Sequence, residues 1–435
     1  MSETSELGVA ARDSRGVNLQ SKKPWLIAVC LAGFFVASFG FMAIHHLEHT
    51  VYVWDNGATD FLVWYRAAVA IGSPDRTGLY AIELPDGERF TTGFFNPPSM
   101  AFLLWPMTKL DIRPAREALL GLSLLAVGGL LLVCWRAGLR GVQFLLACLA
   151  MASFWPLYVA LQYSHPTPIY ALLAAVALIE LEAGATASAG GFMGLLALKP
   201  SLFAAPWGYL LFKRRWVSFL TSGAIALLLF FGPFLLLGTE ALSDYREQSS
   251  RLTADAFKYF DNTTSIGAWG VLNWNGYVAS LILGPPPVIV VAALSIVTIA
   301  LTLRVWAKGT LREGWLASMA MTMLILPHLL VYDWLLLFVP AMAVLAERRT
   351  PLYAGLLVLL HLAINLSAHV APFLMPGFTR DDYDNIRSLG GYWAVPALFL
   401  LLVYLAFRNE IEARLERQVR GQAAVTCPVA EPEPV

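Results

Sequence analysis

Two acids that could act as a general base follow the first long apolar segment of the chain. Asp55 and Asp60 lie five residues apart in the stretch 45–98, which also contains Tyr65 and Asn96. A carboxylate near the end of a membrane helix can take a proton from a hydroxyl group when burial raises its pKa towards the working pH. For either acid taken alone, a solvated loop is the simpler interpretation.

A second group of polar residues interrupts apolar sequence further along the chain. Lys199 lies in Leu198-Lys199-Pro200 between two apolar runs. An ionisable residue at membrane depth is costly and therefore indicates a functional role, although its side chain can also extend to the membrane surface. His328 and Tyr332 are four residues apart, the spacing of one helix face, and Asp333 follows them. An ordinary polar helix turn explains Asp333 equally well.

Composition places these residues in a membrane protein. The chain has 435 residues, of which 58% are hydrophobic and 14% charged, against roughly 25% charged in a soluble domain. Its formal net charge is zero, so no overall field favours nucleic acid. The four cysteines lack metal-ligand or redox spacing, and no phosphate-binding loop or dinucleotide fingerprint occurs, so we expect no cofactor.

The apolar runs predict an all-α, polytopic protein. Trp25–Ile44 provides twenty residues without an acidic or basic side chain, enough for a retained first crossing. Further apolar runs are Ala118–Trp135, Val142–Ala160, Ile169–Ile179, Val217–Gly238, Val288–Leu303, Trp315–Ile325, Leu335–Leu345, Leu352–Ala363 and Ala394–Phe407. Counting half-crossings, about ten to twelve transmembrane helices are expected.

Basic residues set the expected orientation, because Lys and Arg in short loops remain in the cytoplasm. This rule assigns residues 1–24 and 408–435 to cytoplasmic tails and 25–407 to a membrane domain. The main extracytoplasmic loops are then 45–116 and 239–275. Ser99–Leu110 is too short to cross, and Gly190–Phe212 begins and ends in the cytoplasm, so it should form two half-crossings that meet at Lys199.

Several short motifs occur together in a recognisable order. They are Asp60-Phe61-x-x-x-Tyr65-x-Ala67, Gly78-Leu79-Tyr80, Phe94-Phe95-Asn96-Pro97-Pro98-Ser99, Leu198-Lys199-Pro200 and Tyr332-Asp333. As a set they resemble the family 87 glycosyltransferases, which are polytopic enzymes of the GT-C superfamily that use polyprenyl-phosphate sugars. The resemblance implies an inverting transferase that moves a single sugar, mannose or arabinose, to a lipid or glycan acceptor at the extracytoplasmic face. It also implies a bacterial inner (plasma) membrane location among membrane lipids.

The resemblance also implies roles for particular residues. Asp60 matches the catalytic acid of the first outer loop, and Asp55 is the second choice. The candidates for binding the donor phosphate or sugar are Lys199, His328, Tyr332, Asp333, Gln162, Tyr65 and Asn96. The second outer loop contains Gln162 and His165 but no acid, unlike the loop of metal-dependent relatives, so we expect metal-independent transfer.

Two alternatives come from other classes of protein. A transporter or lipid flippase would use the outer acids to bind a coupling ion, and would be expected to have charged residues near the midplane of several helices and repeated halves. A membrane acyl or phosphoryl transferase would rely on His328 and would remain active after replacement of Asp60.

Overall fold

The computed structural model describes residues 28–40, 43–44, 60–73, 79–80, 94, 96–258, 272–282, 287–327, 329–348, 350–369 and 389–426. Within these ranges every regular element is a helix, which confirms the predicted all-α class. The helices are Ala28–Gly40, α2 (Asp60–Gly72), α3 (Pro98–Leu104), α4 (Ile112–Arg136), α5 (Gly141–Ala152), α6 (Trp155–Gln162), α7 (Thr167–Glu182), α8 (Thr186–Leu195), α9 (Pro200–Phe212), α10 (Trp216–Leu237), α11 (Thr239–Lys258), α12 (Trp274–Ile282), α13 (Val288–Lys308), α14 (Leu311–Ile325), α15 (Phe338–Arg348), α16 (Pro351–His369) and α18 (Leu389–Thr426). Three 3-10 segments join them: η1 (Trp105–Lys109), η2 (Leu196–Leu198) and η4 (Val331–Leu337).

Four helices of the described chain are long and apolar enough to cross a membrane. They are α4, α10, α13 and the part of α18 from Trp393 to Gln418. The pair α5–α6 forms a fifth span if it is counted as one helix bent by 46°. The protein is therefore a multi-pass membrane protein. The expected ten to twelve crossings, counted with half-crossings, are not confirmed in the described residues, where many of the apolar runs fold into shorter helices.

Prolines account for many of the breaks between these shorter helices. Pro156, Pro168 and Pro200 occupy the first turns of α6, α7 and α9, where a missing N–H costs nothing, but they prevent the preceding helix from continuing. The helix also breaks at Lys199, whose backbone is non-helical (φ −124°, ψ 89°). The segment Ser99–Leu110 folds as α3 and η1 and is too short to cross, as expected from its length.

Small residues allow α8 and α10 to pack closely. A Cβ atom built on Gly190 would lie 2.7 Å from the carbonyl oxygen of Ser218, and one built on Gly194 would lie 2.7 Å from Cβ of Ile225. Ser218 in addition donates a hydrogen bond of 2.7 Å to the carbonyl of Thr186. Glycine contacts of this kind are typical of helix pairs within membranes.

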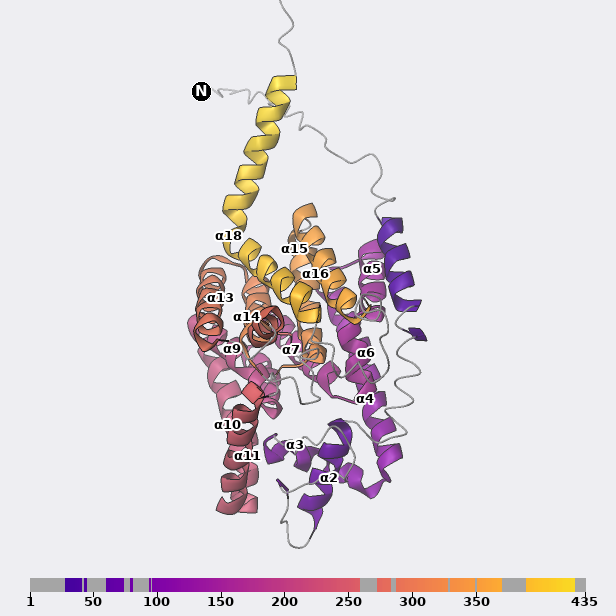
Figure 1. Cartoon of the computed structure of the whole chain (residues 1–435), viewed down its shortest axis with the longest axis vertical. Helices are drawn as coiled ribbons and strands as arrows, with labels where there is room; N and C mark the ends of the chain where they lie inside the picture. Colours follow the sequence, from indigo (N-terminus) through magenta and orange to yellow (C-terminus); the bar gives the residue numbers. More distant parts are fainter. Residues whose placement is uncertain are drawn as a thin grey trace, which may run out of the picture.

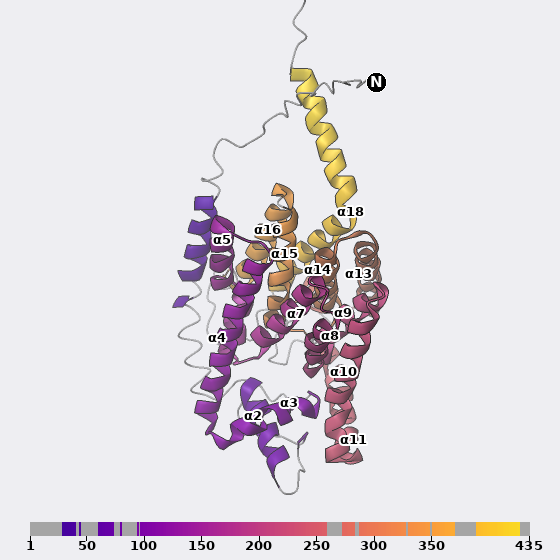
Figure 2. The same ribbon diagram turned by 180° about the vertical axis from the view of Figure 1, so that it is seen from behind.

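The two ends of the helical body differ in character. At one end Arg312 pairs with Glu182 and donates to the carbonyls of Ala137 and Ala343, so it links α4, α7, α14 and α15. At the other end Tyr65 of α2 donates to the carbonyl of Leu110, just before α4 begins. Helix α4 joins the two ends (Figure 2). Its 25 residues span about 37 Å at roughly 1.5 Å per residue, which exceeds the ~30 Å hydrocarbon layer.

Helix α18 bends at the boundary expected between the membrane domain and the C-terminal tail. Phe407 has a non-helical backbone (φ −119°, ψ 16°) inside this helix. Beyond the bend the helix extends away from the body, at the end opposite α2 and α3 (Figure 1). Arg304 of α13 pairs with Glu410, which fixes the first turn of the extension.

Candidate active site

Asp60 is the first residue of α2, where the N-terminal end of the helix dipole favours a carboxylate. The helix is held by its apolar side chains, among which Phe61 packs with Ala115 and Leu119 of α4. Asp60 itself retains some accessible surface. Asp60 is therefore less enclosed by the protein than Asp333, whose side chain is wholly buried.

Asp333 and Lys199 form a buried ion pair. The Nζ atom of Lys199 lies 2.6 and 2.7 Å from the two carboxylate oxygens of Asp333. Asp333 also accepts the backbone N–H of Leu330 at 3.1 Å and faces the hydroxyl of Thr167 at 3.5 Å. Its side chain is wholly buried, whereas that of Lys199 is 15% exposed. The Asp333 carboxylate is thus fully occupied within the protein.

Tyr332 connects Asp60 to this pair. Its hydroxyl is hydrogen-bonded to the Asp60 carboxylate, and its ring lies 5.0 Å from Nζ of Lys199. The other neighbour of the ring is His165, which is stacked on it at 3.9 Å between centroids. Residues from α2, η4 and the break before α9 therefore converge at one point.

His165 completes the site from the loop between α6 and α7. Its Nδ1 atom accepts the backbone N–H of Thr167 at 3.1 Å, so in the neutral ring the proton lies on Nε2. Trp64 of α2 contacts the ring edge to face, with 4.9 Å between centroids. The preceding residue, Ser164, adopts a left-handed conformation (φ 50°) that turns the chain sharply here. The site therefore holds a neutral N–H donor beside its charged groups.

Burial dominates the electrostatics of the site. It raises the pKa of Asp60 from 3.8 to about 6, while the charge of Lys199 and the hydrogen bond from Tyr332 lower this pKa and the charge of Asp333 raises it. Burial also raises the pKa of Asp333 against the opposing effect of Lys199. The pKa of His165 is lowered well below its usual value by burial and then by Lys199, so the ring is neutral.

The structure brings together four of the residues singled out in the sequence: Asp60, Lys199, Tyr332 and Asp333. The remaining described candidates lie elsewhere or are engaged in other contacts. The hydroxyl of Tyr65 is bonded to Leu110, and the backbone carbonyl of Asn96 accepts the hydroxyl of Tyr80 at 3.3 Å.

Gln162, the last residue of α6, is buried two positions before Ser164 and the turn that carries His165. His328 and Asp55 lie outside the described residues.

Sequence reasoning did not anticipate the contacts of His165, Thr167 and Trp64. The sequence marks His165 only as part of an outer loop without acids, because its aromatic partner Tyr332 lies far away along the chain. The local signal for this turn is the polar run Gln162–His165 before Pro166, between two apolar helices.

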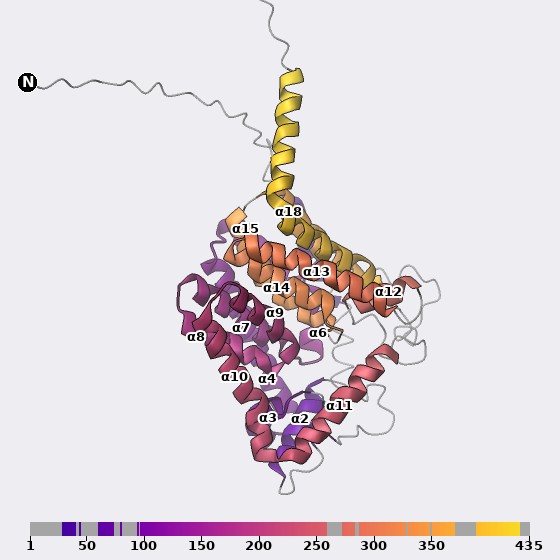
Figure 3. The same cartoon turned by 90° about the vertical axis from the view of Figure 1, so that its left-hand side faces the viewer.

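Helix α11 occupies most of the predicted outer loop 239–275. Gln248 donates to the carbonyl of Tyr80 at 3.1 Å, and Tyr245 packs against Tyr80 with 5.8 Å between ring centroids. Helices α10 and α11 meet at the same end of the molecule as α2 and α3 (Figure 3). Helix α11 therefore borders the Asp60 end of the protein. In the part of the chain that the structure describes, no three His, Cys, Asp or Glu side chains converge as metal ligands do.

Comparison with known proteins gives a single result. No curated protein and no solved structure matches the chain. The family model described as "Glycosyltransferase family 87" matches residues 94–332, more than half of the sequence. This range includes His165, Lys199 and Tyr332, but it begins after Asp60 and ends just before Asp333. With a match of this extent, the chain belongs to glycosyltransferase family 87.

Proposed function

We propose that the protein is an inverting glycosyltransferase that moves one sugar, of the mannose or arabinose type, from a polyprenyl-phosphate donor to a hydroxyl of a lipid or glycan acceptor. The single observation that carries this proposal is the carboxylate of Asp60, which has a pKa of about 6, is hydrogen-bonded to Tyr332 and belongs to a partly exposed residue. Such a group is largely ionised near neutral pH and basic enough to accept a proton. Family membership supports a glycosyltransferase over the transporter or flippase alternative.

In the proposed step, the acceptor oxygen attacks the anomeric carbon while Asp60 removes its proton. A new carbon–oxygen bond forms as the bond from the anomeric carbon to the phosphate oxygen breaks, and polyprenyl phosphate leaves with the electron pair. Because the displacement is direct, the anomeric configuration inverts. Asp333 is a poorer candidate for the base, since it is wholly buried and both of its oxygens contact Lys199.

Lys199 has two proposed roles. Its positive charge lowers the pKa of Asp60 and so helps to keep the base ionised. An ammonium group has three N–H donors, and two of those of Lys199 point to Asp333, which leaves one for the phosphate oxygen on which charge develops. The neutral Nε2–H of His165 is a second such donor. Donors fixed in place before the reaction stabilise developing charge without reorganisation.

The other predicted residues remain candidates for the substrate sites. Gln162 lies close in sequence to the His165 turn and suits hydrogen bonding to sugar hydroxyls. Tyr65 and Asn96 remain candidates in the outer segment, where the Tyr65 hydroxyl and the Asn96 backbone carbonyl also make hydrogen bonds within the protein. His328 retains its predicted role in binding the donor phosphate or sugar. Asp55 remains the second choice for the base.

The proposed orientation puts the Asp60 end outside the membrane and the Arg312 end in the cytoplasm. Arg312 and Arg348, which form ion pairs at the second of these ends, agree with this orientation because basic residues are retained in the cytoplasm. Helix α4 is longer than the hydrocarbon layer is thick, and it separates the Arg312 end from α2, which carries the proposed base Asp60. Both termini are then cytoplasmic, in a bacterial inner membrane.

The test compares two isosteric replacements of acids near the same end. Purified wild type, Asp60→Asn and Asp111→Asn are supplied with radiolabelled polyprenyl-phosphate mannose or arabinose and a membrane-lipid extract. Asp111 is exposed and forms no side-chain cap, so its replacement is the matched control. Loss of a general base should lower the rate by about 10²–10⁴-fold. Undiminished transfer by Asp60→Asn would refute the assignment, and failure of both sugars to react in wild type would refute the donor class.

A further inference from the structure

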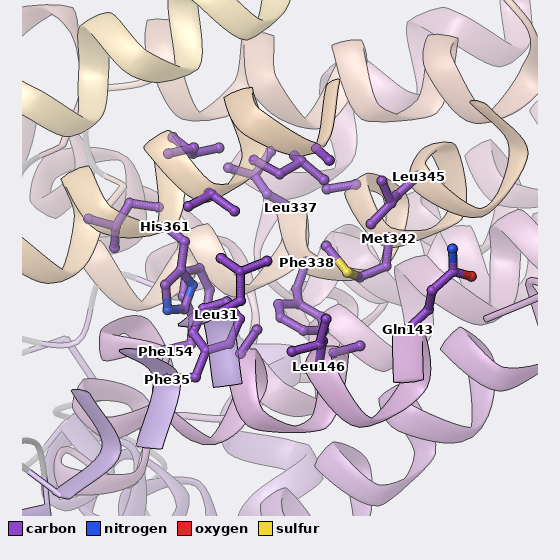
Figure 4. A pocket seen from close by; sticks show the side chains of 18 of the residues that line it. Leu31, Phe35, Gln143, Leu146, Phe154, Leu337, Phe338, Met342, Leu345 and His361 are labelled. Carbon is purple, nitrogen blue, oxygen red and sulfur yellow. The ribbon is translucent and has the colours of Figure 1, made fainter. Parts of the chain in front are cut away.

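A cavity lies away from the Asp60 site, between the helix Ala28–Gly40 and helices α5, α15 and α16 (Figure 4). Its volume is about 340 Å³. Among its described lining residues only Gln143, Thr350 and His361 are polar. Segment η4 separates the two sites, since it supplies Asp333 to the ion pair at one end and Leu337 to the cavity at the other. The cavity is therefore not part of the catalytic cluster.

Hydrogen bonds fix the proton of His361. The Oδ1 atom of Asn365 accepts the backbone N–H of Trp155 at 3.0 Å, and its Nδ2 atom donates to the carbonyl of Ser153 at 2.8 Å. These two contacts fix the orientation of the amide. The same Nδ2 atom lies 2.8 Å from Nε2 of His361, so Nε2 is an acceptor and the ring proton lies on Nδ1.

The Nδ1–H group has no hydrogen-bond partner among the described residues, although the His361 side chain is more than nine-tenths buried. A buried donor without an acceptor is destabilising. His361 lines the cavity, so an acceptor within the cavity would satisfy this group.

The arrangement does not fit a catalytic nucleophile. Ser153 lies 3.1 Å from Nε2 of His361, on the same nitrogen that Asn365 occupies. A nucleophile and the group that orients the base must engage opposite nitrogens of the imidazole. The contacts of Ser153 and Asn365 instead fix the orientation of the His361 ring and leave its Nδ1–H group for a ligand.

His361 and Gln143 lie at opposite ends of the cavity (Figure 4). Pro351, at the start of α16, also lines it and is ten residues from His361, or about 15 Å at roughly 1.5 Å per residue. Arg348, the last residue of α15, pairs with Glu313 at the same end of the molecule as Arg312, so α16 starts at the proposed cytoplasmic surface. His361, about 15 Å further along α16, then lies near the middle of a ~30 Å hydrocarbon layer.

We propose that this cavity binds an isoprenoid quinone, with a ring carbonyl accepting the Nδ1–H of His361. The ester carbonyls of a phospholipid lie near the membrane surface, so they do not reach this depth. No cationic residue lines the cavity in the described chain, which disfavours a lipid phosphate. A quinone is neutral, resides within the hydrocarbon layer and has a flat ring.

Aromatic side chains surround the His361 end and favour a ring over a simple alcohol. Phe154 is stacked on His361 with centroids 5.5 Å apart, and Phe35 contacts it edge to face at 5.0 Å. Phe338 lies 5.9 Å from Phe154 and also lines the cavity. Offset and edge-on packing of this kind accommodates a further planar ring.

Binding of decylubiquinone to the purified full-length protein in detergent tests this inference by calorimetry. His361→Phe removes the donor and should weaken binding roughly three- to tenfold, the effect of one neutral hydrogen bond. Ala354→Trp fills the cavity and should weaken binding more than tenfold. Ser153→Ala leaves Asn365 on Nε2, and Leu125→Trp adds the same bulk on an exposed face of α4, so both should bind as wild type.

Equal binding by wild type, His361→Phe and Ala354→Trp would overturn the site. Farnesol with the affinity of decylubiquinone would overturn recognition of the ring carbonyl, and displacement of the quinone by dioctanoyl phosphatidylglycerol would identify a phospholipid site instead. The assay measures binding without sugar transfer. Its failure therefore leaves the proposed glycosyltransferase mechanism untouched.

Discussion

The pKa of Asp60 makes the pH dependence of sugar transfer a direct test of the proposed base. With a pKa of about 6, about a tenth of Asp60 is ionised at pH 5 and about nine tenths at pH 7. An ordinary aspartate with a pKa of 3.8 is more than nine tenths ionised at both. The value of kcat/KM, which reports groups of the free enzyme, should therefore fall about tenfold between pH 7 and pH 5.

Two variants test the direction in which the acidic limb of the pH profile, the fall of kcat/KM below pH 7, should move. Lys199 and Tyr332 both lower the pKa of Asp60. Lys199→Met and Tyr332→Phe should therefore raise that pKa, so that the limb moves to higher pH and the loss of activity is greater at pH 6 than at pH 8. Tyr332→Phe keeps the ring that stacks on His165, so it separates the hydrogen bond from the packing.

The assay is initial-rate transfer from a labelled donor between pH 4.5 and 8.5 at constant ionic strength. Asp111→Asn should retain the wild-type profile, because this acid is exposed and forms no side-chain cap. A profile that is flat between pH 5 and pH 8 would refute the reasoning. So would a limb that stays near pH 6 in both Lys199→Met and Tyr332→Phe.

Three further outcomes are expected. Lys199→Met leaves the carboxylate of Asp333 buried without its partner and should destabilise the protein by about 3 kcal/mol. The double variant Lys199→Met/Asp333→Leu should recover most of the apparent Tm that the single variant loses. Equal apparent Tm values for the two variants would contradict this expectation. Transfer should be unaffected by EDTA, and loss of activity that Mn²⁺ restores would show that the enzyme needs a metal. In a background without native cysteines, Glu240→Cys should react with an impermeant maleimide in intact cells and Arg136→Cys only after permeabilisation, and the reverse pattern would invert the orientation.

The features of the fold that were predictable from the sequence depend on local chemistry. The non-helical residue between η2 and α9 coincides with Lys199 followed by proline, and the shortness of α3 follows from the length of its apolar run. The bend of α18 at Phe407 lies at the point where apolar sequence gives way to charged residues. The number of crossings was not predictable, because an apolar run does not show whether two short helices pair into one span.

For the site, the sequence identified the residue types but not their relationships. Tyr332 and Asp333 are adjacent in the chain, yet one contacts Asp60 and the other Lys199, because the tight turn of η4 directs consecutive side chains to different neighbours. The stacking of His165 on Tyr332 could not be inferred, since it depends on how α7 packs against η4. An aromatic contact of this kind leaves no periodic signal in a single sequence.

The different environments of the two carboxylates support the proposed division of roles between them. Asp333 is buried, accepts the N–H of Leu330 and contacts Lys199 through both oxygens, so proton transfer to it would weaken contacts that hold the site together. Asp60 is a partly exposed residue, and its carboxylate is hydrogen-bonded to the neutral hydroxyl of Tyr332. The same lysine that pairs with Asp333 also lowers the pKa of Asp60, so in the proposed mechanism one cation stabilises the first acid and keeps the second ionised.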